Sequence, residues 1–115
     1  MSPEAVSKVI TVEIEKQGAV ATVKLRGRLI AGVNEYVYSQ VRPLMPEMKR
    51  VVLDLGEVTQ MDSMGLGAMV RLYVSGKSAG SSVELMHIGK RIREVLGITH
   101  LLDVFTIIGE RGVKL

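Results

Sequence analysis

The clearest fold signal in the chain is the stretch Asp62-Ser63-Met64-Gly65-Leu66-Gly67, where a strand pattern changes into a helix pattern. The residues just before it, 51–55, form a short apolar run with the β-branching of a buried strand. After it, apolar residues recur at helical spacing, and two glycines close the segment. These are Leu66, Met69, Val70, Tyr73 and Val74, followed by Gly76 and Gly80. We therefore expect a strand over 51–55 that leads directly into a helix over about 64–77.

Ser63 stands at this junction, and two roles are open for it. Its hydroxyl can cap the helix, as serine commonly does. The unpaired N–H groups and the positive dipole end of a helix would also receive a phosphate carried by that hydroxyl. Gly65 and Gly67 have no Cβ, so another backbone or a ligand can come close. The two roles of Ser63 do not exclude each other.

Length and composition predict one domain over residues 1–115, with a loose end at residues 1–8. Hydrophobic residues make up 47%, yet no apolar run reaches the ~18–20 residues needed to span a bilayer. The first residues lack the pattern of a secretory signal. We expect a cytoplasmic protein without membrane insertion. The chain contains no cysteine, which excludes disulfides, thiolate metal sites and a cysteine nucleophile.

The charged and aromatic residues argue against several functions. The net charge is +3, the basic residues are scattered, and there are four aromatic residues, so we expect no direct binding of nucleic acid. His87 and His100 lie far apart with no third ligand, so we expect no metal and no cofactor. Asp62 is accompanied by no convergent base or nucleophile relay. We therefore expect no catalytic residues and no enzymatic activity.

Read in order, the chain predicts an α/β domain with a mixed β-sheet and helices packed mainly on one face. Residues 9–15 and 20–26 alternate as the strands of an antiparallel hairpin, which Gly27 ends. Asn34 is expected to cap a helix that runs to about Met45, despite Pro43. Strands at 51–55 and 83–87 flank the central helix as a parallel β-α-β unit. Gly89 opens a short helix, and 104–108 forms a last strand.

The central motif, with its preceding strand, resembles a known family signature. Met61-Asp62-Ser63-Met64-Gly65-Leu66-Gly67, after Val51-Val52-Leu53-Asp54-Leu55, is similar to the signature of the STAS domain family, and within it to bacterial anti-sigma-factor antagonists. The resemblance runs from about Val9 to Ile108. It implies a single STAS-like domain in which Ser63 is the phosphorylated residue. It also implies a partner-binding surface made by Asp62, Ser63, Met64, Gly65, Leu66 and Gly67.

The resemblance further implies a mechanism of partner switching. The unphosphorylated protein would bind an anti-sigma factor with a serine-kinase fold and so free the sigma factor. The kinase would phosphorylate Ser63 and end the binding, and a serine phosphatase would restore it. Asp62 would be either a carboxylate favoured at the helix start or part of the surface that the kinase recognises.

The sequence departs from the antagonist pattern at four points, and two of them, residues 28–30 and Met64, motivate an alternative. Arg28-Leu29-Ile30 replaces an acidic, apolar, aspartate sequence, and Arg28 could instead attract a phosphate. Met64 stands at a position that is usually small or hydroxylated, and Gln60 at one that is usually apolar or aromatic. No closing amphipathic helix is evident after Ile108, which would leave a face on which a homodimer could form. The alternative is a non-switching STAS module, a subunit of a larger regulatory or transporter-associated assembly.

Overall fold

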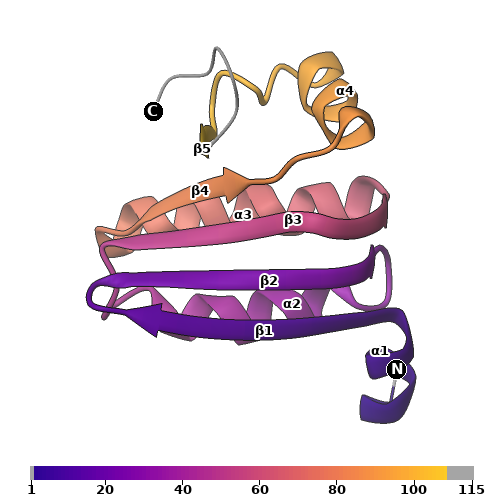
Figure 1. Ribbon diagram of the computed structural model, residues 1–115, viewed down its shortest axis with the longest axis horizontal. Coiled ribbons are helices and arrows are strands. Elements are labelled where there is room, and N and C mark those ends of the chain that lie inside the picture. Colours follow the sequence, from indigo (N-terminus) through magenta and orange to yellow (C-terminus); the bar gives the residue numbers. More distant parts are fainter. Residues whose placement is uncertain (1, 109–115) are drawn as a thin grey trace.

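The computed structural model describes residues 2–108, with four α-helices, one 3-10 helix and five strands in that range. Figure 1 shows their arrangement. In chain order they are α1 (Pro3–Val9), β1 (Ile10–Gln17), β2 (Val20–Leu29), α2 (Asn34–Val41), the 3-10 helix η1 (Arg42–Leu44), β3 (Arg50–Met61), α3 (Ser63–Ala79), β4 (Ser82–Met86), α4 (Lys90–Ile98) and β5 (Thr106–Ile108).

The strands form one mixed sheet in the order β1-β2-β3-β4-β5. β1 and β2 pair antiparallel as a hairpin, and each later neighbouring pair is parallel. The predicted α/β class, the opening hairpin and the parallel β3-α3-β4 unit are therefore confirmed. The junction at Asp62 lies at the carboxyl end of β3, an edge of parallel sheets where functional groups often gather.

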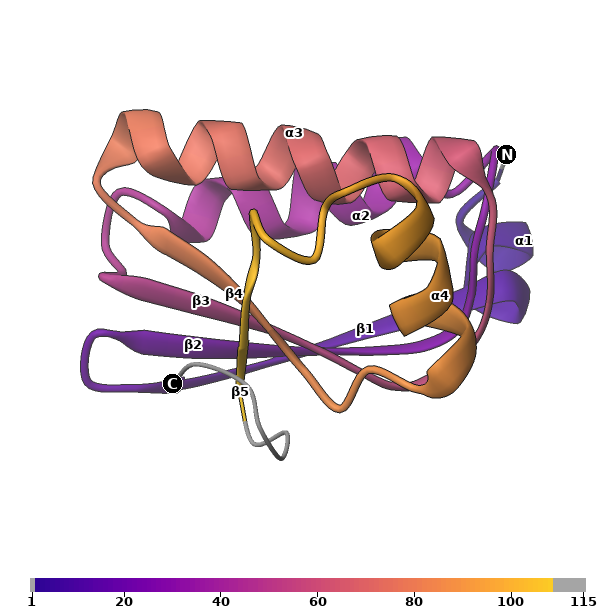
Figure 2. The ribbon, with the colours of Figure 1, turned by 90° about the horizontal axis from the view of Figure 1, so that it is seen from above.

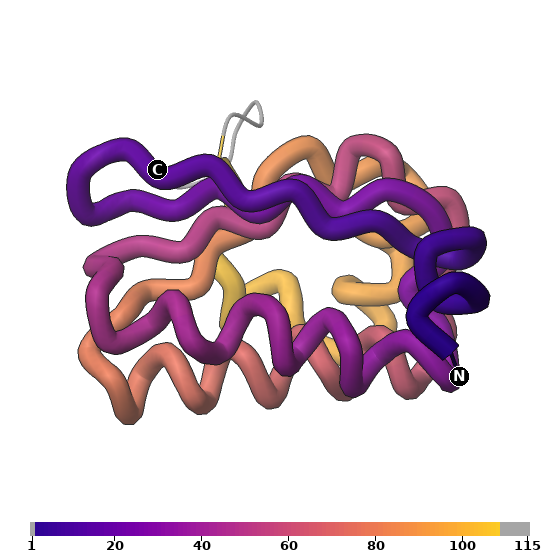
Figure 3. The backbone as a smooth tube through the Cα atoms, turned by 90° about the horizontal axis from the view of Figure 1, so that it is seen from below, coloured from indigo at the N-terminus to yellow at the C-terminus, as the bar shows by residue number. Residues whose placement is uncertain are grey.

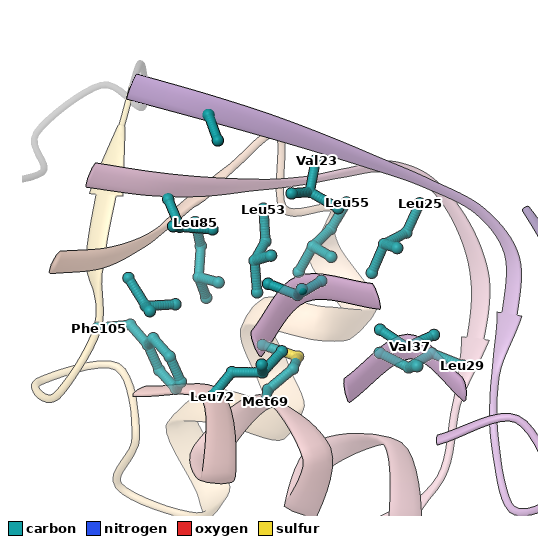
Figure 4. Close-up of a cluster of buried hydrophobic side chains, with 14 of the residues drawn as sticks. Val23, Leu25, Leu29, Val37, Leu53, Leu55, Met69, Leu72, Leu85 and Phe105 are labelled. Atoms are coloured by element: carbon teal, nitrogen blue, oxygen red, sulfur yellow. The ribbon is translucent and has the colours of Figure 1, made fainter. Parts of the chain in front are cut away.

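The core lies between the sheet and the helices on one of its faces. Figures 2 and 3 show α2 and α3 running along the same side of the sheet. Alternate strand residues point to that side, because side chains along a strand alternate between the two faces. The buried side chains from both layers meet in Figure 4, where Leu25, Leu53 and Leu85 of the strands face Met69 and Leu72 of α3. This packing fixes the position of α3 and hence of its first turn.

The N-terminus differs from the loose end expected for residues 1–8. Pro3–Val9 form α1, because Ser2 caps it by accepting a hydrogen bond from the N–H of Ala5, and Pro3 suits the first helical position. Val6 packs into the core with 6% of its surface exposed. Local capping and one buried side chain therefore order a segment whose polar composition predicted a loose end.

The sequence pattern predicted that Gly27 ends the second strand, and this prediction is wrong. β2 continues to Leu29, and β3 runs beside it as far as Met61. Gly27 has a φ of +115°, and a Cβ there would lie 2.2 Å from the carbonyl oxygen of Val9. The glycine thus permits close contact inside a strand, with register shifts on both sides of it.

The helix predicted from Asn34 to about Met45 ends early. α2 stops at Val41, and Pro43 lies in the 3-10 helix η1, because proline cannot continue α-helical hydrogen bonding. Asn34 is the first helical residue and makes no cap; Val33 precedes it without a side-chain bond. Met45, just after η1, is nevertheless buried in the core.

At the other end of the chain, only Thr106–Ile108 of the strand predicted over 104–108 is extended. The expectation that no amphipathic helix follows Ile108 falls on residues 109–115, which lie outside the described residues. The homodimer, which was suggested by the lack of such a helix, therefore stays a prediction.

The face of the sheet away from α2 and α3 carries ion pairs between neighbouring strands. Glu57 lies 2.7 Å from the Lys24 ammonium and 3.0 Å from the Arg26 guanidinium. Hydrogen bonds from Arg26 and Lys24 lower the pKa of Glu57 from 4.5 to about 2. A carboxyl with a depressed pKa stabilises the folded state above its unfolded pKa, and this contribution is lost as the pH falls toward the folded value.

Replacing Glu57 with glutamine should therefore reduce the loss of stability between pH 4.5 and about 2. The effect is modest because the pair is exposed. Urea unfolding at about pH 5 and about pH 3 measures it. Glu15→Gln, on β1 at the edge of the same sheet, is the matched control and should leave the acid sensitivity unchanged. Equal acid sensitivity in Glu57→Gln and the original protein would contradict the assignment.

Candidate functional site

The start of α3 is capped by Asp62 rather than by Ser63. Asp62 has extended backbone angles, and its Oδ1 accepts hydrogen bonds from the N–H groups of Met64 and Gly65, both at 3.0 Å. The prediction that the Ser63 hydroxyl caps the helix is wrong, because Ser63 already has helical geometry as the first residue of α3. Of the two roles weighed for Asp62, the structure shows the helix-start carboxylate.

Asp62 also ties the helix to the loop that follows β2. Its second oxygen, Oδ2, accepts a hydrogen bond from the N–H of Ala31 at 2.9 Å. Three backbone donors therefore share one carboxylate, and they lower its pKa, with the N–H of Ala31 as the largest cause. Asp62 is ionised at neutral pH. The sequence suggested a carboxylate at the helix start, but the bond to Ala31 joins residues 31 apart and has no local signal.

Replacing Asp62 with alanine should lower the free energy of unfolding by about 1–2 kcal/mol, because the cap and the tie to Ala31 are lost together. Chemical denaturation measures this change. Ser63→Ala is the control at the adjacent position and should stay within about 0.5 kcal/mol of the original protein. A larger loss for Ser63→Ala than for Asp62→Ala would show that the cap is assigned to the wrong residue.

Ser63 itself is exposed, and within residues 2–108 its hydroxyl has no hydrogen-bond partner. The hydroxyl is therefore free to react with a kinase that reaches the surface. The sequence suggested that unpaired N–H groups at the start of the helix would receive a phosphate on Ser63. In the structure, the N–H groups of Met64 and Gly65 already donate to Asp62. Such a phosphate would lie on the exposed side of α3, beside the Asp62 carboxylate.

The surroundings of Ser63 combine close backbone packing with uncovered apolar surface. A Cβ on Gly65 would lie 2.0 Å from the carbonyl oxygen of Leu29, so this glycine lets the β2–α2 loop reach α3. A Cβ on Gly67 would meet nothing within 4 Å. Met64 has 50% of its surface exposed. Gly67 and Met64 thus give a flat apolar patch next to Ser63, while the half-buried Leu66 packs against the core.

Arg28 and Leu29, which depart from the antagonist pattern, lie at the end of β2 beside this junction. Arg28 pairs with Gln60 and Leu29 with Met61 in the parallel register of β2 and β3. Leu29 is buried, and Arg28 is exposed. Two of the sequence departures, Arg28 and Gln60, are therefore direct neighbours on adjacent strands, and Gln60 lies two residues before the cap Asp62.

Asp54 belongs to the opposite face of the sheet from Leu53 and Leu55, where its contacts are structural. Its Oδ1 accepts a hydrogen bond from the N–H of Gly56 at 3.0 Å and lies 3.0 Å from His87 Nδ1. Within the described part of the chain, no three His, Asp or Glu side chains come together as metal ligands. No helix among residues 2–108 is long and apolar enough to cross a membrane.

A sequence model of one family, the STAS domain, matches residues 11–112. The chain belongs to the STAS domain family. The match covers both hairpin strands, the Asp62 junction and α4, so the prediction made from the central motif is confirmed.

Solved structures with the same fold include several anti-sigma factor antagonists. One from Mycobacterium paratuberculosis has a TM-score of 0.78 at 20% identity, covering 95% of this chain and 90% of that one. The unphosphorylated form of SpoIIAA, from Bacillus, has a TM-score of 0.73 at 14% identity, with coverage of 87% and 90%. These identities show a shared STAS fold.

A transporter contains a similar STAS fold. The murine anion transporter Slc26a9 in its inward-facing state has a TM-score of 0.65 at 18% identity. The match covers 73% of this chain but 14% of the transporter. The STAS fold thus occurs both as a small protein and as part of a much larger one.

Proposed function

We propose that this STAS domain is an anti-sigma-factor antagonist whose binding is switched by phosphorylation of Ser63. The observation that supports it most is the exposed, unbonded Ser63 hydroxyl on the first turn of α3, beside the apolar patch of Met64 and Gly67. Similar folds are known as anti-sigma factor antagonists, and one of them, SpoIIAA, in both unphosphorylated and phosphorylated forms. The site would act in the cytoplasm as a binding surface, without catalysis or a cofactor.

The switch would work by charge at the docking surface. An anti-sigma factor with a serine-kinase fold docks on residues 62–67 and releases its sigma factor. The kinase then transfers the γ-phosphoryl group of ATP to the Ser63 oxygen, the hydroxyl proton is lost, and ADP leaves. The phosphate adds roughly −1.5 to −2 charge next to ionised Asp62. The kinase is then repelled from a surface that otherwise offers small apolar contacts, and a serine phosphatase reverses the change.

Displacement of a sigma factor tests this function. The protein is added to preformed complexes between each candidate anti-sigma kinase of its own genome and the cognate sigma factor. Size-exclusion chromatography should show release of sigma from one complex and a new complex between the kinase and this protein. Retention of sigma in every complex would contradict the proposal.

The alternative is a non-switching STAS module, and the similarity to part of the Slc26a9 transporter supports it. The departures at Arg28 and Met64 lie at the same junction and would then serve permanent docking. Such a module would hold its partner equally well with serine or aspartate at position 63. Binding that responds to neither phosphorylation nor Ser63→Asp would select this alternative.

A further inference from the structure

β3 extends beyond its neighbour β4 and leaves part of one strand edge unpaired. β4 pairs with β3 only from Arg50 to Asp54. After Met86 the chain turns away at His87, which has a φ of +58°, and β3 carries a register irregularity just past Asp54. Residues 57–61 therefore pair with β2 alone, and Figure 1 shows β3 running on where β4 has left the sheet. The outer backbone groups of this segment are open to a further strand.

A cleft of about 240 Å³ lies between this free edge and α4. Val58 and Met61 line it from β3, and Ile92 and Val95 line it from α4. A volume below the ~300 Å³ of typical small-molecule pockets suits one or two side chains of an extended peptide better than a whole ligand. An open strand edge beside such a cleft is the arrangement used in strand addition, where backbone bonds bind and alternate side chains fill a pocket.

The charged side chains around the cleft are basic and favour an acidic ligand. Lys90 and Arg91 line it from the first turn of α4, both exposed, and within residues 2–108 neither has an ion-pair partner. Cations in the first turn of a helix oppose its dipole, and no hydrogen bond or ion pair within residues 2–108 offsets this cost for α4. The lining contains no carboxylate, because Glu57 faces Lys24 and Arg26 on the opposite side.

We propose that this cleft, between residues 57–61 of β3 and the first turn of α4, binds an extended acidic segment of a partner protein as an added strand. The other long edge of the sheet, β1, carries Glu13 and Glu15, charges that discourage strand pairing. The edge beside the cleft carries the uncharged Val58, Thr59 and Gln60, and its one acidic residue, Glu57, is paired with Lys24 and Arg26. This surface adjoins residues 62–67 but includes none of them, and its binding does not require phosphorylation of Ser63.

A synthetic peptide tests the proposal without knowledge of the natural partner. The probe is a fluorescein-labelled octapeptide of alternating valine and glutamate, and its binding to the full protein is followed by anisotropy. One control peptide has lysine in place of glutamate, and another has every second backbone nitrogen methylated, which blocks strand pairing while keeping the charge. The proposal requires binding of the first peptide only, with both controls at least about tenfold weaker.

Charge reversal in the cleft supplies the matched variants. Lys90→Glu combined with Arg91→Glu should weaken binding of the acidic peptide about tenfold or more. Lys8→Glu combined with Lys49→Glu, which makes the same change in net charge elsewhere, should leave it unchanged. Thermal unfolding of both double variants verifies that they remain folded. Equal losses in the two variants, binding that survives backbone methylation, or displacement by inorganic tripolyphosphate with no effect of methylation would each overturn the proposal.

Discussion

Replacing Ser63 with aspartate should weaken binding of the anti-sigma kinase by about thirtyfold or more, which corresponds to at least ~2 kcal/mol. The new carboxylate would stand next to Asp62, whose oxygens already accept three backbone hydrogen bonds. It would therefore enter the complex as an unpaired charge on a surface that otherwise presents Met64 and Gly67. Isothermal titration calorimetry with the ATP-free kinase measures the loss.

Ser78→Asp is the matched control for this experiment. Ser78 is exposed on the same helix, and the charge change is the same, but it lies 15 residues and roughly 22 Å from Ser63 along α3. Its affinity should stay close to that of the original protein. Equal losses at positions 63 and 78 would mean that the net charge of the protein, rather than the start of α3, controls binding.

Replacing Gly65 with alanine should lower the free energy of unfolding by about 2–4 kcal/mol. The new Cβ would lie 2.0 Å from the carbonyl oxygen and 2.8 Å from the carbonyl carbon of Leu29. These are backbone atoms at the buried end of β2, so the contact is relieved only if the strand or α3 moves. The loss is expected even though alanine favours a helix by about 1 kcal/mol over glycine.

Gly67→Ala, two residues further along α3, should change stability in the opposite direction. Its Cβ would meet nothing within 4 Å, so the gain in helix propensity, up to about 1 kcal/mol, is unopposed. Urea unfolding of the two variants gives the comparison. If Gly65→Ala were as stable as Gly67→Ala, close packing of Leu29 against the helix would not be the reason for a glycine at position 65.

Local patterns were enough to predict the α/β class and the position of the junction. The apolar run at 51–55 and the helical spacing after Gly65 each reflect one buried face, and burial is what the sequence periodicity records. The extensions of β2 to Leu29 and of β3 to Met61 were not predicted. They depend on pairing between strands that are distant in the sequence, and Gly27 interrupts the pattern although its role is close backbone contact.

The candidate site was located from the sequence, but its internal arrangement was not. Ser63 and Asp62 are both good helix caps, so the local sequence does not distinguish them, and the bond from Ala31 to Asp62 appears only in the folded loop. The cleft beside α4 escaped prediction for a similar reason. From the sequence alone, Lys90 and Arg91 are ordinary exposed charges. Only the fold places them opposite the free edge of β3.

Intact-mass spectrometry after incubation with ATP and each candidate anti-sigma kinase tests whether Ser63 is the phosphorylated residue. We expect one kinase to add the mass of a single phosphate to the original protein and none to Ser63→Ala, which the structure predicts to be folded normally. Asp62→Ala, measured alongside, reports whether the kinase also needs the ordered first turn. Phosphorylation of Ser63→Ala to the same extent as the original protein would contradict the proposed switch. So would the absence of an added phosphate on the original protein with every kinase.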